Sequence, residues 1–164
     1  MNILITCPFG LSALLAKELK RLQITPVKTL DTAILATTDW KGIYTINLRS
    51  RLANKCYLIL GESRITTFDQ LFDFVGKLPR GEYLASSNLS IQVVSKHSQL
   101  SAEKSIQSVG HKAILNALTP TITSPKTENT PISTVLFYLD HDQLKVCLNT
   151  SGASLHQRGW RNQT

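Results

Sequence analysis

Up to Ile65, short apolar runs alternate with amphipathic segments in an order that permits few folds. Short apolar runs bounded by turn residues indicate strands, and leucines repeating at helical spacing indicate helices. The predicted strands are 2–7, 27–30, 33–37 and 55–65, and the predicted helices are 11–22 and 40–48. Strand, helix, strand, strand, helix, strand is the order of a ferredoxin-like unit, which we predict for residues 1–64.

The rest of the chain contains the same kinds of elements in a different order, so the predicted fold class is α+β throughout. Helices are predicted over 67–77 and 101–118, and strands over 89–94, 133–139 and 143–149. Residues 119–131 contain three prolines and no apolar period, which predicts an exposed loop. We therefore predict a second α/β unit over 65–155 and a tail or linker over 156–164.

The helix predicted over 101–118 has one apolar and one polar side. Its apolar stripe consists of Ile106, Val109, Ala113, Ile114, Ala117 and Leu118. Its polar side carries Lys104, Gln107, Ser108, His111 and Lys112, and Lys96 and His97 lie just before the helix. Such a polar side is either an ordinary solvated surface or a surface that binds a polyanion.

Charge favours a polyanionic partner. The 164 residues include 18 Lys+Arg and 11 Asp+Glu, which gives a formal net charge of +7. A basic chain makes nucleic acid or another anionic surface the first class of partner to test. In the tail, Arg158 and Arg161 flank Trp160, a pattern suited to stacking on an unpaired base or to covering apolar surface at a domain junction.

Several other classes of protein are disfavoured. Cys7, Cys56 and Cys147 are widely separated and lie in apolar or alternating runs, which predicts buried reduced thiols. No glycine-rich phosphate loop follows a strand, and no histidine pair has metal-ligand spacing, so neither a cofactor nor a metal site is expected. We find no catalytic constellation. The start has no signal-peptide pattern and no window is apolar enough to span a bilayer, which makes a cytoplasmic protein the expectation.

Four stretches, in this order along the chain, carry a resemblance to a known family. They are Phe9-Gly10-Leu11 with the helix that follows, 48–53 (LRSRLA) through Leu60-Gly61-Glu62, Gln107-Ser108 with His111-Lys112-Ala113-Ile114, and 149–152 (NTSG) with 155–161 (LHQRGWR). Together they resemble the N-terminal part of bacterial ribosomal-RNA guanine-N2 methyltransferases, which carry a THUMP domain ahead of a Rossmann-like catalytic domain. His111 stands where Lys is commoner in the family, and Trp160 stands where Tyr is.

The resemblance implies an N-terminal ferredoxin-like domain over 1–64 and, over 65–155, a THUMP domain of the kind that the family uses to bind RNA. Gln107, Ser108, His111 and Lys112 match positions of the family motif, whereas Lys96, His97 and Lys104 are added from charge and placement. In the family, the segment matched by Arg158 to Arg161 leads into the S-adenosylmethionine-binding domain with its Asn-Pro-Pro-Tyr-type loop. This sequence ends at Thr164 without either element.

These observations predict an RNA-binding chain that does no chemistry by itself. It would be the substrate-recognition module, or the detached N-terminal part, of an rRNA methyltransferase. Its expected partners are structured rRNA, contacted through Lys96, His97, Lys104, Gln107, Ser108, His111, Lys112 and Arg158, and a separate catalytic subunit. One alternative is a protein-interaction adaptor that docks such a subunit through its C-terminal tail, and another is a small enzyme on the ferredoxin-like scaffold.

Overall fold

A computed structural model describes residues 1–78, 89–118 and 132–157 of the chain. Their contacts divide the chain into two compact units, Met1–Ile59 with Asn149–Thr164, and Leu60–Leu148. In the described residues no helix is both long and apolar enough to cross a membrane. Each unit is described in turn.

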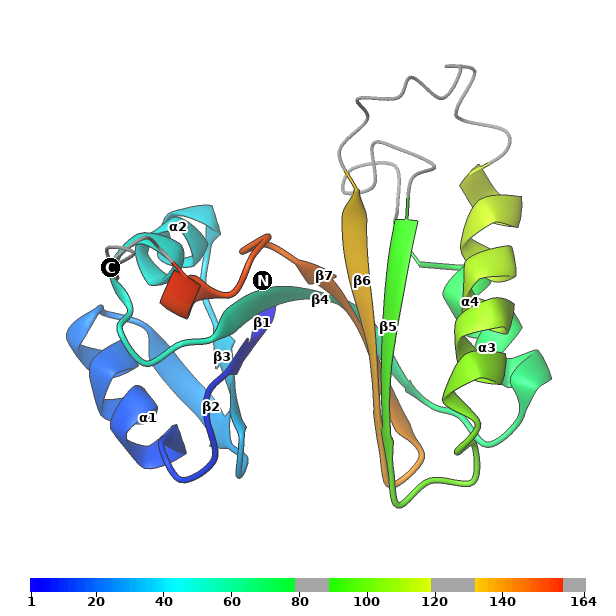
Figure 1. The fold of residues 1–164 in the computed structure, drawn as a ribbon, viewed down its shortest axis with the longest axis horizontal. Helices are drawn as coiled ribbons and strands as arrows, with labels where there is room; N and C mark the ends of the chain where they lie inside the picture. Colours follow the sequence, from blue (N-terminus) through cyan, green and yellow to red (C-terminus); the bar gives the residue numbers. More distant parts are fainter. Residues whose placement is uncertain (79–88, 119–131, 158–164) are drawn as a thin grey trace, which may run out of the picture. The chain divides into compact units, whose positions relative to one another are not determined.

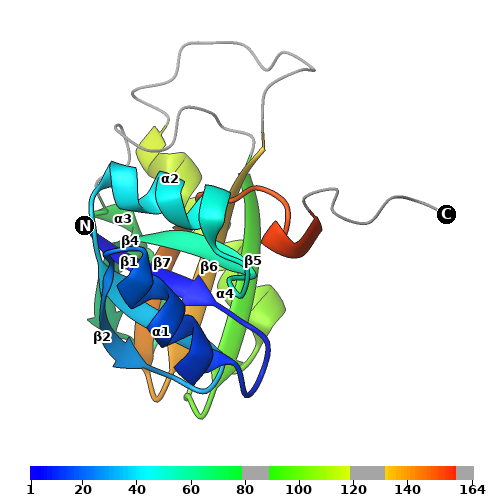
Figure 2. The same cartoon turned by 90° about the vertical axis from the view of Figure 1, so that its left-hand side faces the viewer.

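The first unit has the predicted ferredoxin-like order. Its elements are β1 (Asn2–Thr6), α1 (Ser12–Arg21), β2 (Thr25–Thr29), β3 (Ala33–Thr37), α2 (Trp40–Arg49) and the first half of β4 (Lys55–Arg64). The strands are ordered β2-β3-β1-β4, and β1 pairs antiparallel with both β3 and β4. Helices α1 and α2 lie together on one face of these strands, with the buried Leu15, Leu19, Ile43 and Ile46 on their inner sides (Figure 2).

Side-chain oxygens determine two local features of this unit. The Asp39 carboxylate accepts a hydrogen bond from the Gly42 amide at 2.8 Å, which caps α2. Glu18 on α1 holds the chain where α2 ends. Its carboxylate accepts from the Ser50 hydroxyl at 2.6 Å and from the Arg51 amide at 2.7 Å. Because Ser50 is only 2% exposed, this carboxylate satisfies a hydroxyl that water does not reach.

Residues 150–157, of which we predicted 150–155 in the second unit and 156–157 in the tail, pack on the first unit. The Thr150 amide donates to the Cys56 carbonyl at 3.0 Å, and the Leu155 amide donates to the Asn54 carbonyl at 2.8 Å. Leu155 is only 8% exposed and begins the 3-10 turn η1 (Leu155–Gln157). Backbone hydrogen bonds hold these residues on the first unit, although they have no apolar period. The chain passes from one compact unit to the other between residues 59 and 60 and again between 148 and 149. The predicted domain boundaries follow residues 64 and 155.

The second unit contains the remaining elements. They are the second half of β4, α3 (Phe68–Gly76), β5 (Leu89–Lys96), α4 (Glu103–Leu118), β6 (Ser133–Asp140) and β7 (Gln143–Asn149). Strand β5 pairs parallel with β6, and β6 pairs antiparallel with β7, so that β5 is an edge strand in the order β4-β7-β6-β5. Helices α3 and α4 lie side by side against these strands (Figure 1). The predicted helices and strands of this half are confirmed, while the predicted 119–131 loop lies outside the described residues.

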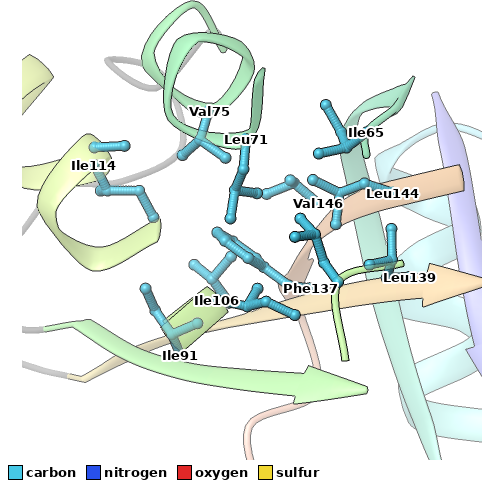
Figure 3. Close-up of a cluster of buried hydrophobic side chains, with 13 residues drawn as sticks. Ile65, Leu71, Val75, Ile91, Ile106, Ile114, Phe137, Leu139, Leu144 and Val146 are labelled. Carbon is cyan, nitrogen blue, oxygen red and sulfur yellow. The ribbon is translucent and has the colours of Figure 1, made fainter. Parts of the chain in front are cut away.

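Phe137 lies at the centre of the second unit's hydrophobic core. It is 0% exposed and is surrounded by Leu71, Ile106, Ile114 and Val146 (Figure 3). Gly110 of α4 lies directly over the Phe137 ring, and a Cβ atom at Gly110 would fall 2.7 Å from the ring Cζ. Glycine therefore lets α4 approach β6 closely at this point. The core thus determines which side of α4 faces away from the sheet.

Candidate nucleic-acid interface

The polar side of α4 borders a groove of about 500 Å³ along the edge strand β5. The helix lines it with Lys104, Gln107, Ser108, His111 and Lys112. Strand β5 and the residue before β6 complete the lining with Leu89, Ser90, Ile91 and Ile132. We call this feature the α4 groove. Five of the residues predicted from the sequence therefore lie in one hollow.

Helical spacing explains how α4 presents these side chains together. Lys104, Ser108 and Lys112 follow one another at intervals of one turn, and Gln107 and His111 form the adjacent row. Lys104 and Lys112 are two turns apart, which is about 12 Å along the helix axis. On the opposite side, Ile106 and Ala113 are each 1% exposed and Ile114 is 2% exposed, which confirms this part of the predicted apolar stripe. The side chains of Ala117 and Leu118 lie outside the described part of the chain.

Gln107 also fastens α4 to the edge strand. Its side-chain amide nitrogen donates to the Ile91 carbonyl of β5 at 3.0 Å. This hydrogen bond fixes the helix relative to β5. It also gives a backbone carbonyl of the edge strand a side-chain partner. Part of the Gln107 amide is therefore committed to positioning the wall of the groove.

The described lining of the α4 groove has a cationic character. Lys104 and Lys112 contribute ammonium groups and His111 contributes an imidazole, while no Asp or Glu is among the lining residues. Ser108 and Gln107 add hydrogen-bonding groups between the cations. Ammonium groups with neighbouring hydroxyl and amide groups suit a ligand that carries several negative charges and polar edges. The hollow therefore offers an anionic ligand two ammonium groups with hydrogen-bonding groups between them.

A second hollow, in the first unit, differs in its chemistry. It measures about 360 Å³ and none of its lining residues is charged. Its lining residues are Asn47, Leu48, Thr150, Ser151, Ala153, Ser154, Leu155 and Gln157. Without a cation it offers a polyanion no electrostatic attraction, so the α4 groove is the better candidate for an RNA contact.

Lys96 and His97, which we expected at the entrance of the helix, lie away from the groove. Lys96 is the last residue of β5, whereas the groove is lined by the first residues of that strand. The stretch from Ile91 to Lys96 is about 17 Å long at a strand's rise per residue. The structure instead brings His97 next to Asp140 and His141. Arg158 lies outside the described residues.

The lining residues that sequence reasoning missed are Leu89, Ser90, Ile91 and Ile132. Residues 89–94 were predicted as a strand and Ile132 directly precedes another. No local pattern indicates which strand lies beside the polar side of a helix. The parallel pairing of β5 with β6 makes β5 the edge, and that edge position creates the groove.

The cysteines form no site of their own in the described residues, where all three are free and buried. Burial raises the pKa of Cys147 from 9.0 to about 12. Burial likewise raises the pKa of Cys56 to about 11, although a hydrogen bond from Thr150 opposes the shift. These thiols are therefore not activated as nucleophiles near neutral pH, which confirms the prediction of buried reduced thiols.

The raised pKa of Cys147 predicts a loss of stability in alkali. Unfolding releases the thiol to ionise near its ordinary pKa of 9.0, so its contribution is complete below pH 9.0 and declines above it. The decline is at most about 1.4 kcal/mol per pH unit. Urea unfolding between about pH 8 and about pH 10 should therefore show a steeper loss for the wild type than for Cys147→Ala. Parallel losses in the two proteins would contradict this account.

Comparison with known proteins identifies the first unit. Residues 2–57 match the RlmL ferredoxin-like domain. Across 99% of its length, the chain is 31% identical to the ribosomal RNA large subunit methyltransferase K/L of Pseudomonas entomophila. It spans 23% of that relative, so it corresponds to the N-terminal region of a much longer protein.

Solved structures extend the likeness to the whole chain. A possible methylase from Clostridium difficile 630 superposes with a TM-score of 0.88 and 25% identity, covering 99% of this chain and 44% of that one. A predicted N6-adenine-specific DNA methylase from Listeria monocytogenes has a TM-score of 0.86 and 29% identity, covering 98% and 43%. The RlmL-type ferredoxin-like unit is thus followed by a THUMP-type unit, and both the resemblance and the α+β fold class are confirmed.

Proposed function

We propose that this chain is the RNA-recognition part of an rRNA methyltransferase and that it contacts RNA through the α4 groove. One observation carries the proposal: the groove has two lysines, a histidine and an amide on one rigid helix face, with no carboxylate in its described lining. Homology to the N-terminal region of rRNA methyltransferases supports RNA as the polyanion. Structured rRNA is the proposed partner.

The proposed mode of binding follows from the residue types. Lys104 and Lys112 contact phosphates, while Ser108 and the imidazole of His111 hydrogen-bond to phosphate, sugar or base edges. Such contacts position an RNA without reading its sequence. Selection of the RNA then depends on its shape, on single-stranded regions that the groove accepts, and on the remainder of the enzyme.

In this proposal the chain by itself transfers no methyl group. Its sequence has neither a glycine-rich loop after a strand nor an Asn-Pro-Pro-Tyr-type loop, so a catalytic domain must supply the S-adenosylmethionine site. The adaptor alternative depends on the C-terminal tail, and 158–164 lie outside the described residues. The cationic lining of the α4 groove supports RNA recognition.

Binding of an RNA oligonucleotide, measured by fluorescence anisotropy at several salt concentrations, tests the proposal. If about four phosphates are contacted, log K should fall against log salt with a slope of roughly −3. Lys104→Ala or Lys112→Ala should each lower affinity about fivefold near 0.1 M salt and flatten the slope by about 0.7. Each variant should lose affinity to the same extent for RNA oligonucleotides of unrelated sequence.

The control is the double variant Lys17→Ala with Lys20→Ala on α1, where both side chains are exposed. It removes more positive charge than either single variant, yet we expect it to leave affinity nearly unchanged. An equal loss in this control would show that attraction comes from diffuse net charge. In that case the α4 groove would not be the RNA site.

A further inference from the structure

Three side chains from two distant segments of the sequence meet at the opposite end of β5 from its residues in the α4 groove. His97 directly follows β5, Asp140 ends β6, and His141 begins the turn to β7. The Nδ1 atom of His141 lies 2.8 Å from Asp140 Oδ1, and that of His97 lies 3.8 Å from the same oxygen. The two imidazole rings are stacked with their centroids 5.0 Å apart. We call these residues the His-Asp-His cluster.

Backbone hydrogen bonds hold the segments that carry the cluster. The His141 amide donates to the Lys96 carbonyl at 3.2 Å, directly joining the turn to the end of β5. The Asp142 amide donates to the Ser98 hydroxyl at 3.0 Å, and the Gln99 amide donates to an Asp142 carboxylate oxygen at 2.8 Å. The loop after β5 is thus tied to the β6–β7 turn independently of the imidazole and carboxylate groups of the cluster.

The backbone at this end of the sheet adopts a costly conformation. His97, His141 and Asp142 have φ values of 47°, 50° and 62°, in the left-handed region that side chains other than glycine rarely adopt. Asn, Asp and His tolerate this region better than other residues, but not without cost. At His141 and Asp142 the positive φ values are those of a two-residue turn between paired strands, because Asp140 pairs with Gln143. The positive φ of His97, outside that turn, is the strain that points to a function for its imidazole.

We propose that the His-Asp-His cluster binds a divalent transition metal ion of the Zn²⁺ class. One ligand atom from each residue lies within 4.8 Å of the other two. A tetrahedral Zn²⁺ with ligands at about 2.0–2.1 Å requires ligand atoms about 3.3–3.4 Å apart. The observed separations of 2.8 and 3.8 Å lie on either side of that value, and the third separation is no more than 4.8 Å. Side-chain rotations that replace the His141–Asp140 hydrogen bond with ligation would be needed to complete the geometry.

The set of ligands selects the class of ion. Two imidazoles and one carboxylate suit Zn²⁺ and its neighbours better than Mg²⁺ or Ca²⁺, which prefer oxygen ligands. Both imidazoles are exposed, with side-chain accessibilities of 73% for His97 and 74% for His141, so water takes the fourth position. The bound ion joins the loop before α4 to the β6–β7 turn. This site does not depend on the proposed RNA contact, because none of its residues lines the α4 groove.

Calorimetric titration of the metal-free 164-residue chain with ZnCl₂ tests this inference, and CoCl₂ gives a second readout by absorption. We expect one Zn²⁺ per chain and a rise in the melting temperature as Zn²⁺ binds the folded state. His97→Asn or His141→Asn should lower affinity at least about tenfold, since even the loss of an outer hydrogen bond has such an effect. Asparagine is chosen because it tolerates positive φ.

His111→Asn and His156→Asn are the matched controls, since neither residue belongs to the cluster. Both should bind Zn²⁺ like the wild type, and the Co²⁺ spectrum should lack the intense thiolate bands that a cysteine ligand would give. The inference is overturned if the wild type does not bind Zn²⁺. It is also overturned if binding survives His97→Asn combined with His141→Asn, or is lost in His111→Asn.

Discussion

Phe137→Ala is expected to lower the free energy of unfolding by about 3–5 kcal/mol, because it removes a fully buried ring and leaves a cavity. Phe137 is 0% exposed and belongs to one buried cluster with side chains of α3, α4, β5 and β7. Gly110 of α4 lies over the same ring, so no side chain on that turn of α4 can fill the space. The cavity therefore cannot collapse cheaply. Urea unfolding followed by far-UV circular dichroism measures the loss.

Two further variants show whether the effect comes from packing between α4 and β6. Phe137→Leu keeps part of the buried volume and should cost less than Phe137→Ala. Gly110→Ala should destabilise by about 1–3 kcal/mol, since its Cβ atom would overlap the Phe137 ring. In an exposed helix the same change would stabilise by about 1 kcal/mol. A stabilising Gly110→Ala, or a loss below about 1 kcal/mol in Phe137→Ala, would contradict the described packing.

The core also matters for the α4 groove, because the same contacts determine which side of α4 faces outward. Ile106, Gly110 and Ile114 pack inward, and helical geometry then places the polar residues on the outward side of α4. Gln107 then fixes the distance from α4 to β5 through its bond to the Ile91 carbonyl. Loosening the core around Phe137 should therefore weaken the proposed RNA contact as well as lower stability.

Most elements and the polar side of α4 were predictable, because both depend on patterns within a few residues. The apolar period over 106–114 is confirmed by burial, and Asp39, of a residue type favoured at helix N-caps, caps α2. The ferredoxin-like order followed from the sequence of elements, since few sheets accommodate it. Grouping Lys104, Gln107, Ser108, His111 and Lys112 required only that the helix form.

Contacts between distant segments could not be predicted. Lys96 and His97 are close to α4 in the sequence, but they lie at the end of an extended strand whose beginning lines the groove. The parallel register pairs Lys96 with Asp140, and this register brings His97 to His141. Scattered histidines therefore gave no sign of a metal site in the sequence. Likewise, Glu18 reads as one more exposed charge on α1 until Ser50 and Arg51 are placed beside it.

Reversing two charges in the α4 groove, with Lys104→Glu and Lys112→Glu together, should reduce RNA affinity by several hundredfold near 0.1 M salt. Loss of two phosphate contacts alone accounts for about 25-fold, at roughly 0.7 of a released counterion per contact. Each introduced carboxylate then repels a phosphate, and we expect the repulsion to add at least a comparable factor. Both positions are exposed. The carboxylate introduced at Lys104 lies in the first turn of α4, where the helix dipole stabilises a negative charge. The protein should therefore remain folded.

The matched control is Lys17→Glu with Lys20→Glu on α1, which likewise changes the formal net charge by four, from +7 to +3. General attraction between a basic protein and RNA would weaken equally in both double variants. If the site is on α4, the α1 variant should keep most of its affinity for RNA and almost the full salt slope. In that case the two lysines that it replaces contact no phosphate in the wild type. Circular dichroism should show the same helical content in the two variants. Equal affinities would place the RNA contact outside the α4 groove, whereas a large difference would assign binding to that helix face.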